Sequence, residues 1–503
     1  MDAPRVTASG GGLAEALGQG IDPGSEILAG QVPHLADAPG LPLSAWSWAL
    51  FQGVRDPYIV IIAIYIFAPY FSSVVVGDPV RGQTLVANIS TTEGVIVCLT
   101  APLLGSVVNR LGPRKPWLAL TALIMCLLTA CLWFVHPGPG GLPIWTAAVL
   151  LGAIPTFLIY SDVLHNALIR FAAPAHKGAA ASGLAYALVN AVSVSVLVFI
   201  LWAFVLPGRF HWPVLPRAPL FGLSSALHEP ERISGPLVAG LMALGAVPFF
   251  FLCPDAPRST TPLRLAVREG LRELKETLAL LKTSRDIALY LGARMLYTDG
   301  KTALLAFGGL YAQGVMRWGV LQMLAYGLIL SCFAVIGGGV GALLDQKIGP
   351  RRAVMVEVAG SLACVVASTG MRPDVILYVM PWSAAHPAAW SGGLYPSLPE
   401  LIYLGIGCGT AVFVTAAYAS SRTLLARLAP PERLGSFFGL YALSGSATMW
   451  LGSLLVGLFT ALMHSQQAGF LAIAALLALG LALMGLVRGG DAEPGPKAKV
   501  YKN

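Results

Sequence analysis

The chain has 503 residues, of which 56% are hydrophobic and only 11% are charged. Because soluble domains carry roughly 25% charged residues, this composition excludes an ordinary soluble domain and indicates an integral membrane protein. The net charge of +8 does not indicate a nucleic-acid partner, because the basic residues lie in short loops between apolar segments.

Residues 1–43 are rich in Gly, Ala and Pro and contain no apolar core flanked by basic residues. We therefore expect a disordered cytoplasmic tail and no cleavable signal peptide there. Apolar segments of about 20 residues follow, long enough to cross a hydrocarbon core of about 30 Å. In the N-terminal half, 44–253, the predicted spans are 46–76, 84–109, 117–135, 144–170, 178–206 and 233–253. In the C-terminal half, 287–488, they are 287–314, 318–344, 353–370, 399–427, 434–463 and 467–488.

This pattern predicts an all-α membrane fold with twelve transmembrane helices in two pseudo-symmetric six-helix halves, so both termini lie on one side. The loops on that side carry Arg110, Arg114, Lys115, Arg170, Lys177, Lys347, Arg351, Arg352, Arg422, Arg427 and Arg433. The opposite loops carry only Arg81, Arg209, Arg217, Arg232, Arg317 and Arg372. Because positive residues are retained inside, we expect both termini, including the tail 489–503, in the cytoplasm. We expect the membrane to be a bacterial inner membrane.

Residues 254–286 join the halves and have the pattern of an amphipathic helix. Thr261 can cap this helix, and Pro262 suits its first position. Apolar residues recur at steps of three and four from Leu263 to Leu281, while Arg, Lys and Glu fill the other face. We expect this helix to lie on the cytoplasmic membrane surface. The seven cysteines lie in apolar runs without a CxxC pair, so we expect no disulfide framework, metal site or cofactor.

A short basic motif follows the second and the eighth predicted span, as GSVVNRLGPRK at 105–115 and GALLDQKIGPRR at 341–352. The first glycine of each copy allows close helix approach, and the second suits a tight turn. The basic residues can bind carbonyls at helix ends, and the acidic position can pair with an arginine in one conformation only. We predict a gate from these residues, with simple positive-inside anchoring as the alternative. The predicted gate residues are Gly105, Asn109, Arg110, Gly112 and Arg114 in the first copy and Gly341, Asp345, Gly349 and Arg351 in the second.

The motif pair and a second repeat, Tyr160–Leu184 with Tyr418–Leu440, indicate two homologous halves. This arrangement resembles the major facilitator superfamily over about 46–488, although Asn109 replaces the family's aspartate. Four stretches resemble its vacuole-effluxer (autophagy-related) branch: Asp56 with FAPYF at 67–71, Asp299-Gly300, SRT at 421–423 and FFGLY at 437–441. That resemblance implies export of small solutes, which are amino acids for the fungal vacuolar members. Arg55-Asp56 also resembles the Lys-Asp pair in span 1 of the glycoside–pentoside–hexuronide cation symporters.

Ionisable residues inside membrane spans are costly and usually face a cavity or a partner. Spans 1 and 7 are equivalent in the two halves, so Asp56 and Asp299 are expected to approach a central site from opposite sides. Burial favours the neutral form of a carboxylate, which can then carry a proton. The structural alternative is an ion pair of Asp56 with Arg294 or of Asp299 with Lys301. The further candidates for coupling or solute contact are Arg55, Glu93, Asp162, Arg294, Lys301, Tyr58, Tyr160 and Tyr311. Glu357 is expected to be a satisfied polar group near the cytoplasmic gate, and His165 an inert packing residue, with a proton relay as its alternative.

The sequence contains no Gly-x-x-x-x-Gly-Lys-[Ser/Thr] loop for ATP and no metalloprotease or nucleophile-elbow motif, so we expect no enzyme. We predict a secondary active transporter that moves a small polar solute, an amino acid or related metabolite, by alternating access, in the export direction and with proton coupling. A cation-coupled sugar or glycoside symporter and a non-transporting sensor are the alternatives. The expected partners are the solute, a proton or other cation and membrane lipids, and the expected state is a monomer.

Overall fold

The computed structural model describes residues 40–489, except for 175–176, 209–212, 258–261, 280, 282–284, 384, 391–392, 430–436, 438–439, 442–443 and 446. The two predicted tails lie almost wholly outside the described residues. Within the described part, ten helices are long and apolar enough to cross a membrane. Two more, α12 (Arg285–Met316) with its internal charges and the 15-residue α17 (Met449–Met463), complete the predicted twelve-helix count. The all-α membrane fold is therefore confirmed.

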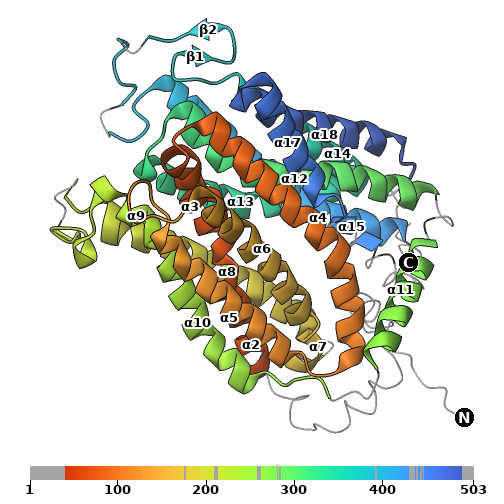
Figure 1. Ribbon diagram of the computed structural model, residues 1–503. Helices are drawn as coiled ribbons and strands as arrows, with labels where there is room; N and C mark the ends of the chain where they lie inside the picture. Colours follow the sequence, from red (N-terminus) through yellow and green to blue (C-terminus); the bar gives the residue numbers. More distant parts are fainter. Residues whose placement is uncertain are drawn as a thin grey trace, which may run out of the picture.

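The N-terminal half (Figure 1) begins with one span, Leu43–Val75, which combines α2 (Leu43–Arg55), a π-helical stretch (Ile59–Tyr65), α3 (Phe67–Tyr70) and a second π-helical stretch (Phe71–Val75). Its other helices are α4 (Pro79–Leu111), α5 (Lys115–Cys131), α6 (Ile144–Asn166), α7 (Ile169–Ala172), α8 (Gly178–Ile200), α9 (Glu229–Arg232) and α10 (Ser234–Leu252). In the C-terminal half, α12 is followed by α13 (Val320–Ile348), α14 (Pro350–Thr369), α15 (Leu398–Leu428), α17 and α18 (Gln466–Leu486).

The first span is broken at its charged pair. α2 ends at Arg55, the Asp56 amide still donates to the Gln52 carbonyl at 3.0 Å, and Pro57 then has no N–H to continue the ladder. The chain goes on in π-helical form, a geometry that is rare and often found at functional sites. Arg55 and Asp56 are therefore placed at a helix end, where their side chains can turn toward a neighbouring helix.

The two ends of the bundle differ. One end, which we call the hairpin end, carries the short antiparallel strands β1 (Val375–Ile376) and β2 (Met380–Pro381) between α14 and α15. The other, the linker end, carries α7 and the linker helix α11 (Leu263–Ala279), which packs against α4. The predicted helix in the linker is therefore present, starting directly after Pro262, while Thr261 lies outside the described residues.

The halves meet mainly through α4 and α17. A Cβ at Gly94 would come within 2.9 Å of Trp450, and the Cys98 thiol donates to the Ala447 carbonyl at 3.3 Å. A second contact joins the middle of the first span to α12, where a Cβ at Gly309 would fall 2.0 Å from the Ile64 carbonyl oxygen. These approaches need residues without a side chain, so glycine sets how closely the halves pack.

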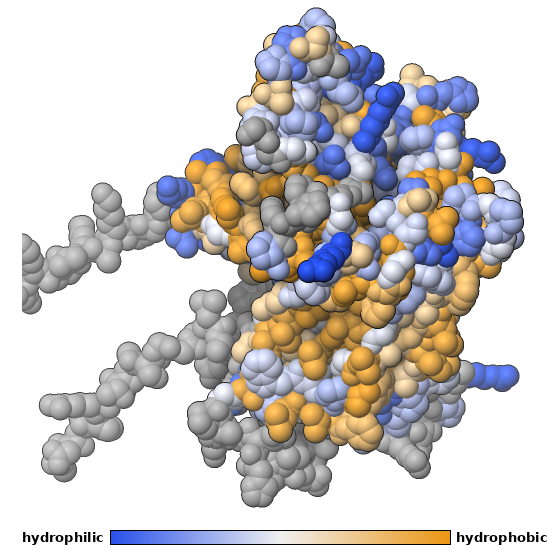
Figure 2. Space-filling model, turned by 90° about the vertical axis from the view of Figure 1, so that its left-hand side faces the viewer, coloured by the Kyte–Doolittle hydropathy of each residue, from blue (hydrophilic) through white to orange (hydrophobic). Residues whose placement is uncertain are grey.

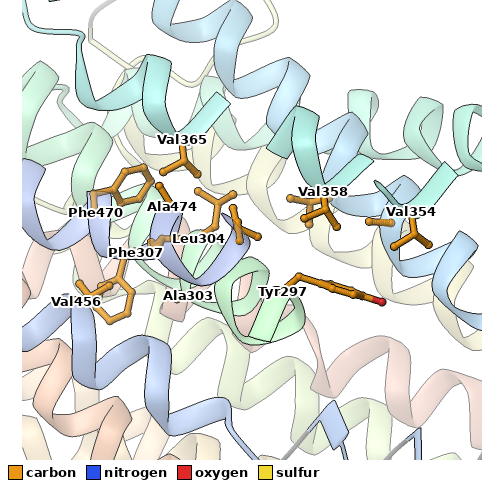
Figure 3. Packing of buried hydrophobic residues seen from close by; sticks show 14 of the residues in the cluster. Tyr297, Ala303, Leu304, Phe307, Val354, Val358, Val365, Val456, Phe470 and Ala474 are labelled. Atoms are coloured by element: carbon orange, nitrogen blue, oxygen red, sulfur yellow. The ribbon is translucent and has the colours of Figure 1, made fainter. Parts of the chain in front are cut away.

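Each half has its own apolar core. In the C-terminal half, Tyr297 and Phe307 of α12 pack against valines of α14 and against Phe470 of α18 (Figure 3). On the face drawn in Figure 2, hydrophobic residues form a broad belt between more hydrophilic ends, as expected for a surface in contact with lipid.

Candidate functional site

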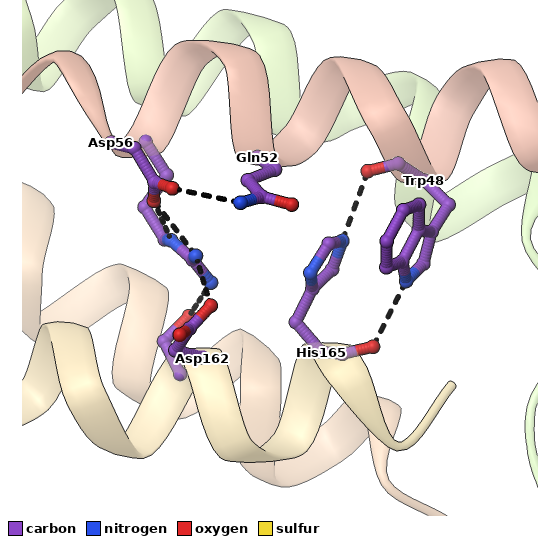
Figure 4. Close-up of polar contacts among 7 residues, drawn as sticks. Trp48, Gln52, Asp56, Asp162 and His165 are labelled. Atoms are coloured by element: carbon purple, nitrogen blue, oxygen red, sulfur yellow. Dashed lines mark hydrogen bonds and ion pairs between the residues drawn. The ribbon is translucent and has the colours of Figure 1, made fainter. Parts of the chain in front are cut away.

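The N-terminal half contains a charge triad of Arg55, Asp56 and Asp162 (Figure 4). The Arg55 guanidinium lies 2.7 Å from carboxylate oxygens of both Asp56 and Asp162, and it also donates to the Ser161 hydroxyl at 3.2 Å. Gln52 donates to the second Asp56 oxygen at 3.0 Å. The triad therefore joins α2 to α6 and satisfies its arginine with two carboxylates.

Solvent reaches the members of the triad unequally. The side chains of Arg55, Asp56 and Asp162 are 1%, 15% and 45% exposed. One cation between two carboxylates leaves one net negative charge when both acids are ionised, so the group can take up one proton and become neutral. The exposed member, Asp162, is the one that water reaches most easily.

The ion pairs suggested by the sequence are wrong. Among the described residues no ion pair joins Asp56 to Arg294 or Asp299 to Lys301. Asp56 is paired instead with its neighbour in the chain, because the break at Pro57 lets both side chains point at α6. Arg294 lies in the other half, where it donates to the Tyr441 carbonyl and the Ser444 hydroxyl, both at 2.6 Å.

Beside the triad, His165 and Trp48 fasten the same two helices (Figure 4). The Trp48 indole donates to the His165 carbonyl at 2.9 Å, and His165 Nε2 lies 2.9 Å from the Trp48 carbonyl. Since a carbonyl only accepts, Nε2 must carry the hydrogen. The rings stack at 4.4 Å, and the imidazole is fully buried. This placement fits the packing role expected for His165.

The other candidate residues of the N-terminal half differ in how far their side chains are buried. Glu93 of α4 is half-buried and makes no hydrogen bond or ion pair within the described part of the chain. The Tyr160 hydroxyl lies 2.6 Å from that of Thr100, which is exposed. Tyr58 is 2% exposed and belongs to the apolar core. Glu93 and Tyr160 therefore keep part of their surface accessible, and Tyr58 does not.

Asp299 does not approach the triad. It is buried against α17, where one carboxylate oxygen accepts the Gly452 amide at 2.7 Å. Gly452 lies in the first turn of α17, whose amides lack partners within the helix, so a carboxylate there is stabilised. Asp299 therefore contacts a helix of its own half, and the approach of Asp56 and Asp299 to one central site stays a prediction.

The remaining C-terminal candidates lie among aromatic rings. The Lys301 ammonium is fully buried, 3.8 Å from the Tyr418 ring centroid and 5.2 Å from that of Tyr297. The Tyr297 hydroxyl lies 2.9 Å from the Ser421 hydroxyl. Tyr311 is packed as well, stacked on Phe470 at 4.3 Å. Ser421, from one stretch that resembles the effluxer branch, thus contacts α12, which carries another such stretch, Asp299-Gly300.

Both copies of the basic motif make sharp turns and bind helix ends. Gly112 and Gly349 have φ of 92° and 83°, a region that other residues rarely adopt. Arg114 donates to the Ala167 carbonyl at 2.8 Å, and Arg351 to the Gly485 carbonyl at 3.1 Å. These bonds place the basic side chains on the carbonyl ends of neighbouring helices.

The remaining motif positions differ between the copies. A Cβ at Gly341 would lie 3.0 Å from the Ala416 carbonyl, whereas one at Gly105 would make only an ordinary contact at 3.6 Å. One Asp345 oxygen is buried without a hydrogen bond. The side chains of Asn109 and Arg110 lie outside the described residues. Close helix approach is therefore a property of the second copy alone.

An amide latch, Gln83 with Thr460 and Gln466, joins the halves at the hairpin end. Gln83 Nε2 donates to the Thr460 hydroxyl at 2.8 Å and to the Gln466 carbonyl at 3.2 Å, and Gln466 Nε2 donates back to Gln83 Oε1 at 3.1 Å. All three side chains are buried. Sequence reasoning missed this contact, because an uncharged glutamine near the end of a span gives no signal of its own.

Comparison with known proteins gives a family and a fold. A family model described as "Vacuole effluxer Atg22 like" matches residues 231–493. The chain is 27% identical over 241 residues to autophagy-related protein 22 of Yarrowia lipolytica, covering 47% of this chain and 36% of that protein. It is 21% identical over 285 residues to the Kluyveromyces lactis protein of the same name, covering 54% and 53%. The chain thus spans about half or less of the curated relatives it matches.

Solved structures agree on the fold. A mutant of the nucleoside transporter NupG superposes with a TM-score of 0.60 at 12% identity, covering 89% of this chain and 99% of that one. A D-xylose–proton symporter gives 0.55 at 13% identity, covering 89% and 98%. The curated relatives are eukaryotic, so the expected bacterial inner membrane is not supported, whereas the integral membrane location is.

Proposed function

Because the chain belongs to the family of Atg22-like vacuole effluxers, we propose that it is a membrane transporter that moves a small polar solute, an amino acid or related metabolite, by alternating access. The two halves, 44–253 and 287–488, would rock about their shared interface, with 254–286 as the connecting segment. We further propose that the linker end and both termini face the cytoplasm, because the basic loops lie there. Export of the solute and a monomeric state complete the proposal.

The observation that carries this proposal is the charge triad. A fully buried arginine between two carboxylates would serve only as a structural clamp if both acids were closed to water, but Asp162 is 45% exposed. One proton changes the net charge of the triad from minus one to zero. Protonation of Asp162 weakens its bond to Arg55, and that bond joins α2 to α6. In this proposal proton binding is thereby linked to the contact between α2 and α6.

Solute binding is proposed at the open polar groups of the same half. Glu93 has no partner of its own among the described residues and can pair with an ammonium group, while Thr100 and Tyr160 offer hydroxyls. An amino acid supplies an ammonium group to such a carboxylate. Competition between solute and proton for these acids would make the two fluxes dependent on each other.

The test uses purified protein in proteoliposomes with an equimolar mixture of radiolabelled proteinogenic amino acids. Wild type should catalyse counterflow, and it should accumulate label when a pH gradient is imposed. Asp162→Asn, which removes the exposed carboxylate of the triad, should keep counterflow and lose the gradient-driven accumulation. Glu231→Gln, the same kind of change in a carboxylate outside the triad, is the matched control. Accumulation by Asp162→Asn at the wild-type level would refute the coupling role.

A cation-coupled sugar symporter is the second candidate, favoured by the hydroxyls of Thr100 and Tyr160, which lie 2.6 Å apart in the half that contains the charge triad. Hydroxyls and carboxylates together suit a polyhydroxylated solute as well as an amine. Replacing the amino acids by radiolabelled monosaccharides, with sodium and proton gradients imposed separately, distinguishes the two. Counterflow of label with sugars alone would select this candidate.

A further inference from the structure

The C-terminal half contains buried charged groups whose hydrogen-bonding capacity is not filled. Among the described residues, one polar atom each of Arg294, Asp299, Lys301, Asp345 and Glu357 is buried without a hydrogen bond. No member of the charge triad has such an atom. Buried polar atoms without a partner are rare in folded proteins, and each needs a physical explanation. This cluster of charged examples in one half indicates a site there.

Glu357 is the acidic centre of this group. Its side chain is fully buried on α14, one oxygen accepts the Ser420 hydroxyl of α15 at 2.9 Å, and the other oxygen has no hydrogen bond. Seven residues separate it from the start of α14 at the linker end, which is about 10 Å along the helix. The sequence suggested a satisfied polar group, and the structure shows a carboxyl with one oxygen unused.

Lys301 is its basic counterpart. The charged groups that act on Glu357 are Asp345 of α13 and Lys301 of α12. Those that act on Lys301 are Glu357 and, on its own helix, Arg294. Within the described part of the chain, no ion pair joins Lys301 to Glu357. The ammonium faces the Tyr418 ring, and an aromatic face stabilises a cation without taking up a proton.

A buried carboxylate without a paired cation is expensive, so it takes a proton unless an opposite charge lies close. Lys301 contacts aromatic rings and makes no hydrogen bond within the described part of the chain, whereas Glu357 is hydrogen-bonded through one oxygen and can exist in both forms. When Glu357 is ionised, its bond to Ser420 is charge-assisted and roughly twice as strong as when it is neutral. Protonation therefore loosens the contact between α14 and α15 near the linker end.

We propose that Glu357 is a second proton-binding site of the transport cycle, with Lys301 as the basic group that acts on it and Ser420 as the contact that senses its protonation. The carboxylate takes its proton from water that enters from the linker end. It releases the proton to water that reaches it in the same way. This inference rests on the proposed transport function. It adds a titrating group in the half opposite to the charge triad.

The first experiment needs no solute. Infrared difference spectra of purified protein, recorded between acidic and alkaline pH, report the C=O band of protonated carboxyl groups. Wild type and Glu231→Gln should share a band that is missing from Glu357→Gln and present again in Glu357→Asp. Size-exclusion profiles establish that each variant is folded. An unchanged band in a folded Glu357→Gln protein would overturn the proposal.

The second experiment uses the amino acid mixture in proteoliposomes. With one proton per solute, a gradient of one pH unit sustains accumulation of about tenfold. Glu357→Gln should retain counterflow within about twofold and lose the accumulation, and Glu357→Asp should restore part of it. Wild-type accumulation in Glu357→Gln would contradict the inference but leave the transport function standing. Absence of counterflow in wild type with both solute classes would contradict the transport function, while the infrared result still tests the proton site.

Discussion

From the hydrogen bonds of the amide latch we predict how much free energy holds the two halves together at the hairpin end. Gln83→Leu keeps the size of the side chain and removes three hydrogen bonds, two to Gln466 and one to Thr460. A buried hydrogen bond contributes about 1 kcal/mol net, so the closed state should lose about 3 kcal/mol. When the halves separate, water satisfies the same groups, so the open state is hardly affected. The ratio of open to closed molecules should rise roughly a hundredfold.

The population of the open state can be measured by thiol modification. Ser453 is buried on α17, on the same helical face as Trp450 and Gly457, which contact α4. In a background without the native cysteines, Ser453→Cys should react with a hydrophilic thiol reagent only when the halves part. Its modification rate then scales with the open fraction, even where that fraction is small. Gln83→Leu should raise this rate roughly a hundredfold.

Thr129→Val is the matched control, because it removes a buried hydroxyl that lies within one half. It should leave the modification rate within about twofold of the parent. If Gln83→Leu, properly folded, also reacts within about twofold of the parent, the latch does not hold the hairpin end closed. The energetic reasoning from its three hydrogen bonds would then be wrong.

Two other properties follow from burial of charged or reactive groups. Arg55→Met leaves Asp56 beside an apolar side chain and should cost about 3 kcal/mol, the lower end for a broken buried pair because Asp162 is open to water. Thermal unfolding should show a lower Tm, and adding Asp56→Asn to the same protein should recover most of it. Burial raises the pKa of the Cys253 thiol to about 12, above its ordinary value. At pH 8 only about one thiol in ten thousand is then ionised, so maleimide should label Cys253 readily in SDS and very slowly in the folded protein, and rapid labelling of the folded form would contradict this burial.

Hydropathy located the spans, but it misplaced some of their ends. The second span was predicted to begin at residue 84, whereas α4 begins at Pro79. Arg81 and Gln83 in its first turns hide the start from an apolar pattern. The Asp78 side chain accepts the amides of Val80 and Arg81, and Pro79 occupies the first helical position. An Asp-Pro pair is a recognised helix start, so the missing signal was in the sequence and came from capping.

The sequence alone determined the features that depend on composition or on residues close together in the chain. The apolar runs imposed membrane-spanning helices, Pro57 imposed the break beside Arg55 and Asp56, and the glycines at 112 and 349 allowed the turns of the repeated motif. Each of these follows from chemistry within a few residues of the chain.

Only the tertiary structure decided which charged groups meet. Arg55 forms an ion pair with Asp162 of another helix. Asp299 accepts a hydrogen bond from the Gly452 amide of α17. Glu357 of α14 likewise accepts a hydrogen bond from Ser420 of another helix, α15. Which side chains meet depends on how each helix is rotated about its own axis, and the packing of neighbouring helices fixes that rotation. A nearly uniform apolar sequence does not determine it.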